Sequence, residues 1–521
     1  MKKILSYFSA VILSLFLIPL QAIAASQNIY VNLENLKYST NGTNYTDIVS
    51  YENLDEFLVD YDSNNLPKIY ITNFLFDGVA AVKSPDLDDF IEEGSNDAKI
   101  KTLEIKVINI NTTGNIQFSG EITGAMIGVD TNDKKGEINI ILNNATIDTD
   151  SKKAPAIYVY NKDKNYTDCI VTIKTVSGTK NYLEGGKLKK VSLVGSDELE
   201  KYSSYYSGDS LTNYNNYSAY YGIYSSSEIE KILFATAKAD NEDLQDGDPY
   251  YFYKASGAIS SDIDLYFNGE GYLKVTSKNK EGIETKGNLT FSGGTGDYEI
   301  YAEDDCLNTT TANNSASEAR NDLTINVHSL LAYVATDADE GDAIDSNGKL
   351  IIEGGTIYAF ANPNSQDAGL DSVNGTYING GVVIATGNMA DQIAQDSEQN
   401  FIYASFNQIE AGTLVVIKNQ DDEIIVAFKT ERTVKNLLYS EPNLQYDSYK
   451  IFTGGTIEGE ETNGLYSTIK NYSGGEEISF NNLGGKNSSV QNNNIEILTI
   501  ATLGIEVLLL IIAITIYWKK F

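Results

Sequence analysis

The chain has 521 residues, of which 42% are hydrophobic, and it carries 72 acidic against 38 basic residues. Its length allows two or three domains or one long repeat array, and its hydrophobic content is enough for a sizeable core. The net charge of −34 argues against a nucleic-acid partner and favours the binding of cations.

Both ends of the chain carry apolar segments. Residues 1–24 combine two lysines, an apolar run and Ala-Ile-Ala, which predicts a secretory signal peptide. Residues 496–518 are almost wholly apolar and long enough to cross a bilayer as a transmembrane helix. The lysines in the tail, residues 519–521, predict a cytoplasmic end. The sequence therefore predicts a single-pass membrane protein of the cell membrane with an extracellular body.

The segment before the repeats shows no periodicity, and a tyrosine-rich stretch interrupts the chain later. Residues 25–100 are predicted to form an N-terminal cap, because stacked repeats need covered ends. Residues 202–224 contain eight tyrosines among Ser, Asn and Gly. A tyrosine ring has a flat apolar face and a polar tip, which suits stacking on a sugar. A loop packed over the core is the alternative. The predicted carbohydrate-binding residues are Tyr220, Tyr221, Tyr224, Tyr251 and Tyr253.

Residues 257–391 contain a repeat. Five apolar residues recur at steps of 24, 24, 37 and 26 positions, namely Ile259, Ile283, Leu307, Ile344 and Leu370. A second set follows them, namely Leu265, Leu289, Leu323, Leu350 and Tyr377. Each unit reads as two or three short strands with glycine corners and without a helical pattern. This period predicts a parallel β-helix over residues 101–395, with a β-propeller as the alternative.

Composition predicts the structure of the remaining segments. Residues 396–470 are predicted to form a small C-terminal β region, and residues 471–495 are rich in Gly, Asn and Ser, which predicts a flexible stalk. Cys169 and Cys306 are 137 residues apart, about five layers of a β-helix. That separation is too long for a disulfide, so both are predicted to be buried thiols.

Acidic residues recur beside the first set of apolar positions. Stacked layers would bring equivalent carboxylates to about 5 Å from one another, where they repel. Calcium, which takes six to eight oxygen ligands, would relieve that repulsion. A solvated acidic edge or a hydrogen-bonded Asn/Asp ladder is the alternative. The predicted calcium-binding residues are Glu281, Glu284, Asp304, Asp305, Asn308, Asp339, Asp342, Asp345, Asp367 and Asp371.

Enzymatic interpretations rest on fewer residues. The Asp-Asp-Cys at 304–306 resembles a polygalacturonase motif, but His328, the only histidine, is followed by Ser329. The Arg-x-Lys of those enzymes is missing. A pectate-type lyase needs a basic residue beside calcium, for which Arg320 and Lys286 are the candidates. We therefore predict that the protein is not an enzyme.

Two runs resemble a known family. Residues 257–275 begin Gly-Ala-Ile-Ser-Ser-Asp-Ile-Asp-Leu, and residues 281–295 read Glu-Gly-Ile-Glu-Thr-Lys-Gly-Asn-Leu-Thr-Phe-Ser-Gly-Gly-Thr. They resemble the β-helical carbohydrate-binding domain family of clostridial-type cell surfaces. Residues 411–415, 449–456 and 463–467 fit the same family, so the resemblance covers about 220–480 and is looser over 101–219. It implies a right-handed β-helix, bound calcium, binding of cellulose and acidic sugars, and no established catalysis.

The sequence as a whole predicts an all-β protein. Its expected fold is a right-handed parallel β-helix with an N-terminal cap, a small C-terminal β region and one C-terminal transmembrane helix. Its expected function is calcium-stabilised, non-catalytic binding of polysaccharide, either cellulose or an acidic pectin-like glycan, at the cell surface. The alternatives are a surface adhesin or structural protein with a protein or cell-wall partner, and a calcium-dependent pectate-type lyase.

Overall fold

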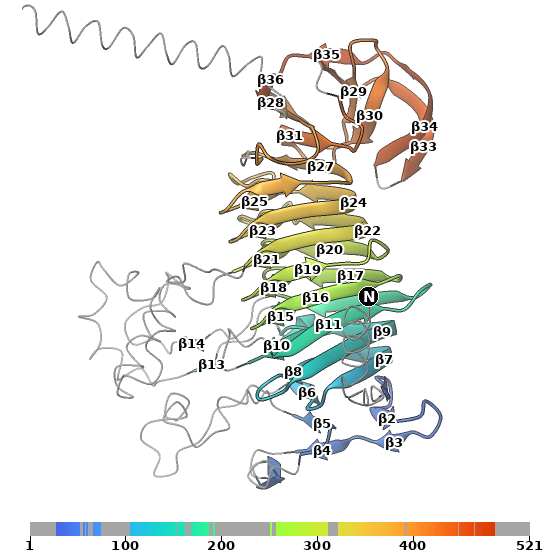
Figure 1. The fold of residues 1–521 in the computed structure, drawn as a ribbon, viewed down its shortest axis with the longest axis vertical. Coiled ribbons are helices and arrows are strands. Elements are labelled where there is room, and N and C mark those ends of the chain that lie inside the picture. Colours follow the sequence, from blue (N-terminus) through green and yellow to red (C-terminus); the bar gives the residue numbers. More distant parts are fainter. Residues whose placement is uncertain are drawn as a thin grey trace, which may run out of the picture.

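The computed structural model describes residues 28–73, 105–192, 251–252, 257–310 and 321–484, apart from gaps at 53–55, 58, 61–65, 153, 162–167, 187–190, 390, 392, 446–447 and 463. Regular structure in these ranges is almost wholly β, with one 3-10 turn, η2 (Asp150–Lys152). The strands stack as rungs along the long axis, and a separate group of strands lies at the C-terminal end of the stack (Figure 1).

A ten-stranded sheet runs along one side of the stack, and all its neighbouring strands are parallel except β5 and β6. Its strands, in spatial order, are β25 (Leu370–Ser372), β23 (Ile344–Ser346), β21 (Leu307–Thr309), β18 (Ile283–Thr285), β15 (Ile259–Ser261), β10 (Ile157–Tyr160), β8 (Ala125–Asp130), β6 (Lys106–Ile110), β5 (Ile69–Thr72) and β4 (Val49–Tyr51).

An 18-stranded sheet forms the other sides and mixes parallel with antiparallel pairs. Its strands are β1 (Asn28–Asn32), β2 (Lys37–Ser39), β3 (Thr46–Asp47), β7 (Gly114–Thr123), β9 (Gly136–Asp148), β11 (Cys169–Thr175), β12 (Lys180–Gly185), β16 (Leu265–Gly269), β17 (Tyr272–Ser277), β19 (Leu289–Phe291), β20 (Asp297–Ala302), β22 (Leu323–Val334), β24 (Leu350–Phe360), β26 (Thr376–Ile378), β27 (Val382–Gly387), β28 (Phe401–Ile409), β31 (Val434–Ser440) and β36 (Asn481–Gly484).

A six-stranded antiparallel sheet forms most of the C-terminal group. It contains β29 (Leu414–Lys418), β30 (Ile424–Lys429), β32 (Lys450–Thr453), β33 (Thr456–Thr462), β34 (Leu465–Ser473) and β35 (Glu476–Ile478). The short pair β13 (Val191–Ser192) and β14 (Tyr251–Phe252) stands apart. Strands β35 and β36 lie within residues 471–495, the segment predicted as a flexible stalk.

The first set of repeating apolar residues pairs in register. Ile259, Ile283, Leu307, Ile344 and Leu370 are consecutive partners along the ten-stranded sheet. The second set is right in four of five positions, because Leu265, Leu289, Leu323 and Leu350 pair but the fifth partner is Thr376. Tyr377 is one residue out of register, and a slip of one residue moves a side chain to the opposite face of a strand.

The interior is built from alternate residues of each strand. Strands β17 and β20 both alternate between half-buried and buried side chains, as a sheet with one face in the core requires. Residues from successive rungs therefore meet in the core, and Phe267 stacks on Phe291 with ring centroids 4.6 Å apart. The two cysteines, Cys169 and Cys306, are buried and free, as predicted.

The predicted fold class needs correction. In a right-handed parallel β-helix each strand pairs in parallel with equivalent strands above and below, whereas here β1–β2, β5–β6, β27–β31 and β28–β31 are antiparallel. Within the segment predicted as an N-terminal cap, β1 pairs in parallel with β7 of the main sheet. The all-β class was right, and the single regular β-helix was wrong. Hydrophobic period alone does not encode the direction of the end strands.

The predicted membrane anchor is also corrected. Among the described residues, no helix is long and apolar enough to cross a membrane. The transmembrane helix at 496–518 and the signal peptide at 1–24 lie outside the described residues. The predicted single-pass localisation and membrane partner rested on that apolar segment alone, so the structure gives them no support.

Glycine pairs permit close approach of neighbouring rungs. Gly355 has a φ of 111°, and a Cβ on it would lie 2.5 Å from the carbonyl oxygen of Val327 in the neighbouring strand. Gly381 repeats the arrangement with a φ of 86° and a Cβ position 2.5 Å from the Gly355 oxygen. The recurring Gly-Gly thus marks corners where a side chain fits neither the backbone nor the space.

Replacement of Gly355 by Ala tests this requirement against Gly412→Ala. Gly412 also has a positive φ, 76°, but no atom lies within 4 Å of its Cβ position. We expect Gly412→Ala to lower the free energy of unfolding by about 1–2 kcal/mol through backbone strain. Gly355→Ala should cost roughly a further 1–3 kcal/mol through the clash. Urea unfolding measures both, and equal losses would show that the close approach is not limiting.

Candidate functional site

The ten-stranded sheet places acidic residues in two columns. Directly after the paired apolar residues, Glu284, Asn308, Asp345 and Asp371 are consecutive partners. Two residues before the same apolar residues lie Glu281, Asp305 and Asp342. Four of the predicted residues thus share one ladder and three more lie beside it, as the repeat requires.

Lysines neutralise the N-terminal half of these columns. Lys286 forms an ion pair with Glu284, whose side chain is 5% exposed. Lys280 forms a second ion pair with Asp304 at 2.9 Å. At this end the repulsion between stacked carboxylates is relieved by the chain's own ammonium groups.

The C-terminal half has no such partner. Carboxylate oxygens of Asp342, Asp345 and Asp371 all lie within 4.8 Å of one another, and all three side chains are half-buried. None of the ion pairs between described residues involves these three acids. Two full charges at this separation repel by roughly 3 kcal/mol at the effective dielectric constant near a protein surface. Among the described residues, no lysine or arginine relieves the repulsion in this half of the columns.

The cluster shifts the pKa values of its members upward. Burial raises the pKa of Asp342 to about 8, against a hydrogen bond from the Ala368 N–H, and Asp371 adds to the rise. Burial and then the charge of Asp371 raise the pKa of Asp345 to about 7. Burial and then Asp391 raise the pKa of Asp371. These carboxyls resist holding several negative charges together.

Two polar atoms on the two rungs before the cluster have no hydrogen-bond partner. They are Glu281 Oε2 and Asn308 Oδ1, both buried. Each is an oxygen, and an oxygen from a carboxylate or an amide is the ligand that calcium prefers. Buried polar atoms are normally satisfied, so an orphaned oxygen next to an acidic cluster fits a site for a hard cation.

Some predicted ligands instead bind the backbone. Asp305 accepts the N–H of Asp342 at 2.8 Å, and Asp342 accepts the N–H of Ala368 at 2.6 Å. Asp367 accepts the N–H of Gly341 at 2.7 Å. This is the hydrogen-bonded ladder that the sequence left open as an alternative, and it uses one oxygen of each carboxylate. Asp339 is exposed and lies outside the three-acid cluster.

One acidic residue at the site escaped the sequence prediction. Asp391 accepts hydrogen bonds from the N–H and the hydroxyl of Ser372, each at 3.1 Å, and its charge acts on Asp371. It follows the last repeat and has no equivalent in the earlier units. In the sequence, only its position 20 residues after Asp371 could have indicated that it lies near the acidic columns.

The predicted carbohydrate-binding tyrosines are not brought together by the described structure. Tyr220, Tyr221, Tyr224 and Tyr253 lie outside the described residues. Tyr251 begins β14, which pairs with β13. Their role stays a prediction.

The residues considered for catalysis lie on different parts of the molecule. His328 is exposed in β22 of the 18-stranded sheet, with Nδ1 2.7 Å from Asp297 Oδ1. Cys306 is buried, and Asp304 and Asp305 precede β21 of the ten-stranded sheet. Arg320 lies outside the described residues. The described residues therefore assemble no polygalacturonase-like constellation.

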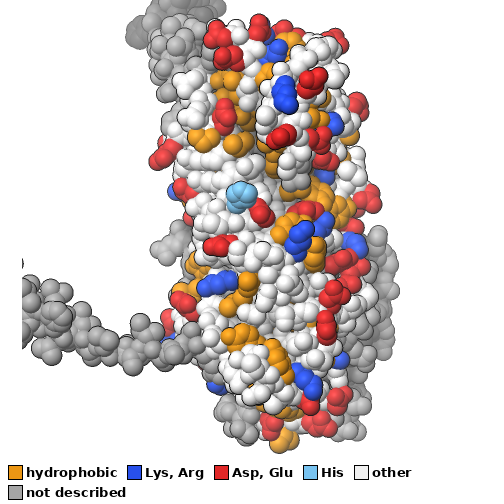
Figure 2. All heavy atoms as spheres, turned by 90° about the vertical axis from the view of Figure 1, so that its right-hand side faces the viewer, with side chains coloured by type: hydrophobic (Ala, Val, Ile, Leu, Met, Phe, Trp, Pro, Cys, Tyr) orange, Lys and Arg blue, Asp and Glu red, His pale blue; other side chains and the backbone are white. Residues whose placement is uncertain are grey.

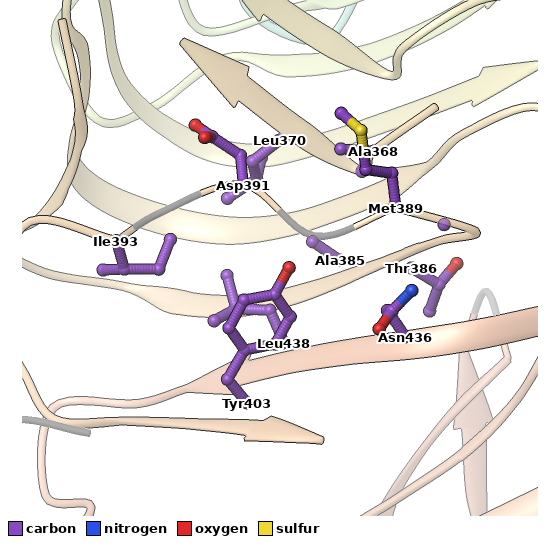
Figure 3. Close-up of a pocket in the computed structure, with 12 residues that line it drawn as sticks. Ala368, Leu370, Ala385, Thr386, Met389, Asp391, Ile393, Tyr403, Asn436 and Leu438 are labelled. Atoms are coloured by element: carbon purple, nitrogen blue, oxygen red, sulfur yellow. The ribbon is translucent and has the colours of Figure 1, made fainter. Parts of the chain in front are cut away.

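A small pocket lies where the last rungs meet the C-terminal strands (Figure 3). Leu370, Thr386, Tyr403 and Asn436 line it, with Asp391 on the side of the acidic columns. Its volume is about 20 Å³, little more than a bound water needs. A sugar ring does not fit into this pocket.

Together, an all-β stack of strands with open outer faces and a column of oxygen ligands defines a scaffold suited to binding extended ligands. The chain belongs to the family of carbohydrate-binding domain-containing proteins, whose profile matches residues 104–213 and 223–431, more than half of its length. No curated protein and no solved structure matches it. The family supports a carbohydrate-binding role and suggests binding rather than catalysis, without excluding an enzymatic activity.

The raised pKa values predict how stability depends on pH in the absence of metal. In the folded state Asp342 and Asp345 hold protons up to about pH 8 and about pH 7, whereas unfolded aspartates release theirs near pH 4. The unfolded state then binds fewer protons, so the free energy of unfolding should fall as pH rises from about 4 to 8. Urea unfolding in a chelator measures this.

The double variant Asp342→Asn/Asp345→Asn is the control for that pH dependence, because it removes both titrations. Its unfolding free energy should depend less on pH over the same window. An identical pH profile in the variant and the parent would contradict the assignment to these two carboxyls.

Proposed function

We propose that this protein binds polysaccharide without catalysis and that a calcium ion stabilises its stack of strands. The observation that carries the calcium assignment is the cluster of Asp342, Asp345 and Asp371, which no lysine among the described residues neutralises. The family match supports the carbohydrate role. Polysaccharide is the favoured class of ligand, either cellulose-like or acidic and pectin-like.

The calcium ion would stabilise the fold, and it would influence carbohydrate binding only through that stability. Asp342, Asp345 and Asp371 come from two neighbouring rungs, so an ion between them would join β23 to β25. Asn308 and Glu281, whose buried oxygens are unpartnered, belong to the two preceding rungs. Calcium tolerates six to eight ligands in irregular geometry, which suits side chains supplied by a stack of strands.

Replacement of both Asp345 and Asp371 by Asn tests the ion. At a calcium concentration a hundred times the Kd, the parent protein should gain about 2.7 kcal/mol of unfolding free energy, and the variant should gain almost none. In a chelator the variant should be at least as stable as the parent, because two repelling charges are gone. Thermal unfolding with and without calcium measures both effects.

Asp421→Asn is the matched control for that experiment. Asp421 lies exposed in the turn between β29 and β30, away from the cluster. The substitution Asp421→Asn removes one carboxylate but should leave the effect of calcium on thermal unfolding unchanged. A parent protein whose melting is insensitive to calcium, with no heat of binding in titration calorimetry, would eliminate the calcium site.

Carbohydrate binding is tested with the whole chain on insoluble cellulose, with and without polygalacturonate as competitor. We expect cellulose to retain the protein, since the family binds carbohydrate. Release of the retained protein by polygalacturonate would indicate that it also binds an acidic glycan. Absorbance near 235 nm on polygalacturonate would detect an unsaturated lyase product. Absence of binding to every glycan tested would contradict the proposed function.

A further inference from the structure

Four tyrosines lie on successive rungs of the 18-stranded sheet. Tyr182 is in β12, Tyr272 in β17, Tyr301 in β20 and Tyr333 in β22, and these strands pair in that order. All four stand at positions that alternate with buried ones, so they face away from the core. We call these four residues the tyrosine row. The row runs obliquely over the sheet, because Tyr182 lies opposite Lys274 and Tyr301 lies opposite Thr276, four residues beyond Tyr272. Along the strand direction Tyr301 is thus about 13 Å from Tyr272.

The tyrosine row consists of two aromatic pairs with a charged pair between them. Tyr182 and Tyr272 have ring centroids 6.1 Å apart, and Tyr301 and Tyr333 have centroids 5.2 Å apart. Between the pairs, Lys274 Nζ lies 2.6 Å from Glu299 Oε1. Figure 2 views the molecule from the side on which β22 and β24 are labelled in Figure 1, and hydrophobic and charged side chains are interspersed there.

Glu299 holds the rings in place. It accepts hydrogen bonds from the hydroxyls of Tyr272 at 2.6 Å and Tyr333 at 3.0 Å, in addition to that from Lys274. Burial opposes ionisation, but the hydrogen bonds from Lys274 and Tyr272 hold the pKa of Glu299 below its usual range. A fixed aromatic ring loses little conformational entropy when a ligand stacks on it, so the network prepares the face for binding.

Most charges on this face have a partner. Glu299 pairs with Lys274, Glu184 with Lys278, and Asp297 contacts the exposed His328. Lys180, opposite Tyr272 in β17, is exposed and is in none of the ion pairs between described residues. One lysine is a small positive charge with which to attract an anionic glycan to a chain whose net charge is −34. An uncharged chain fits it better, with its apolar ring faces on tyrosine and its hydroxyls near Lys274 and Glu299.

The C-terminal strands end the row at one side. Leu331 and Tyr333 pack against a hydrophobic cluster that includes Phe360, Val434 and Leu437. The outer face is covered beyond β22, while Tyr182, at the other end, is 40% exposed. The uncovered part is thus an oblique strip over β12, β17 and β20 that ends where Tyr333 of β22 packs against the C-terminal strands.

From these observations we infer that the tyrosine row, with Lys274 and Glu299, binds a linear, uncharged polysaccharide of the β-linked glucan type across the strands. This inference rests on the proposed carbohydrate-binding function and gives it a location. The row lies on the 18-stranded sheet, and the acidic columns lie on the ten-stranded sheet. Calcium should therefore influence this binding only through the stability of the stack.

The test measures binding of cellohexaose to the whole chain by titration calorimetry, with calcium present. Tyr182→Ala and Tyr301→Ala should each weaken binding by about fivefold to tenfold, because each removes one stacking ring. Tyr45→Ala is the matched control, since Tyr45 is 41% exposed and lies near the N-terminal end, away from the row. It should leave the affinity unchanged, and circular dichroism checks that all variants fold.

The outcomes separate this inference from the proposed function. Loss of affinity in the row variants but not in Tyr45→Ala supports the inference. Unchanged affinity in the row variants overturns the location and leaves the proposed function standing. A parent protein that binds polygalacturonate but not cellohexaose overturns the choice of an uncharged glycan. A parent that binds neither, nor any other polysaccharide, contradicts the proposed function itself.

Discussion

Parallel pairing of equivalent residues holds this molecule together, since it places one apolar residue from each rung directly over the next. Ile259, Ile283, Leu307, Ile344 and Leu370 form such a line, and all are nearly or wholly buried. The same register applies to every other position of the repeat. Residues next to these apolar residues in the chain are therefore also stacked on their equivalents in the neighbouring rungs, whether that stacking is favourable or not.

For acidic residues the stacking is unfavourable, and the chain compensates in two ways. Lys286 pairs with Glu284 of its own rung, and Lys280 pairs with Asp304 of the next rung. Asp305 and Asp342 each accept an N–H from the next rung with one oxygen, and the other oxygen of Asp305 accepts from the side-chain amide of Asn308. Asp345 and Asp371 form no ion pair with a lysine among the described residues, and the proposed calcium ion would supply the positive charge at this end of the columns.

The two large sheets separate two kinds of chemistry. The ten-stranded sheet has short strands and concentrates carboxylates at its corners, whereas the 18-stranded sheet has strands long enough to carry side chains on an open outer face. Tyr272 and Tyr301 lie on that face, where Lys274 and Glu299 form an ion pair and Glu299 accepts the hydroxyl of Tyr272. Stability and recognition can thus depend on different residues of one repeat. A variant in one set need not disturb the other.

The sequence by itself determined the repeat, its apolar line and the stacking of Glu284, Asn308, Asp345 and Asp371, because a fixed period with one buried residue per unit leaves few alternatives. It could not determine the pairing direction of the end strands, and the prediction of a regular β-helix was therefore wrong. It also could not decide which acids lysines neutralise, or that Thr376 rather than Tyr377 continues the second line. Only the tertiary structure decided these points, because each depends on side chains that are close in space and distant along the chain. Only the tertiary structure shows the tyrosine row as well, since nothing in the spacing of Tyr182 and Tyr272 indicates that β12 lies beside β17.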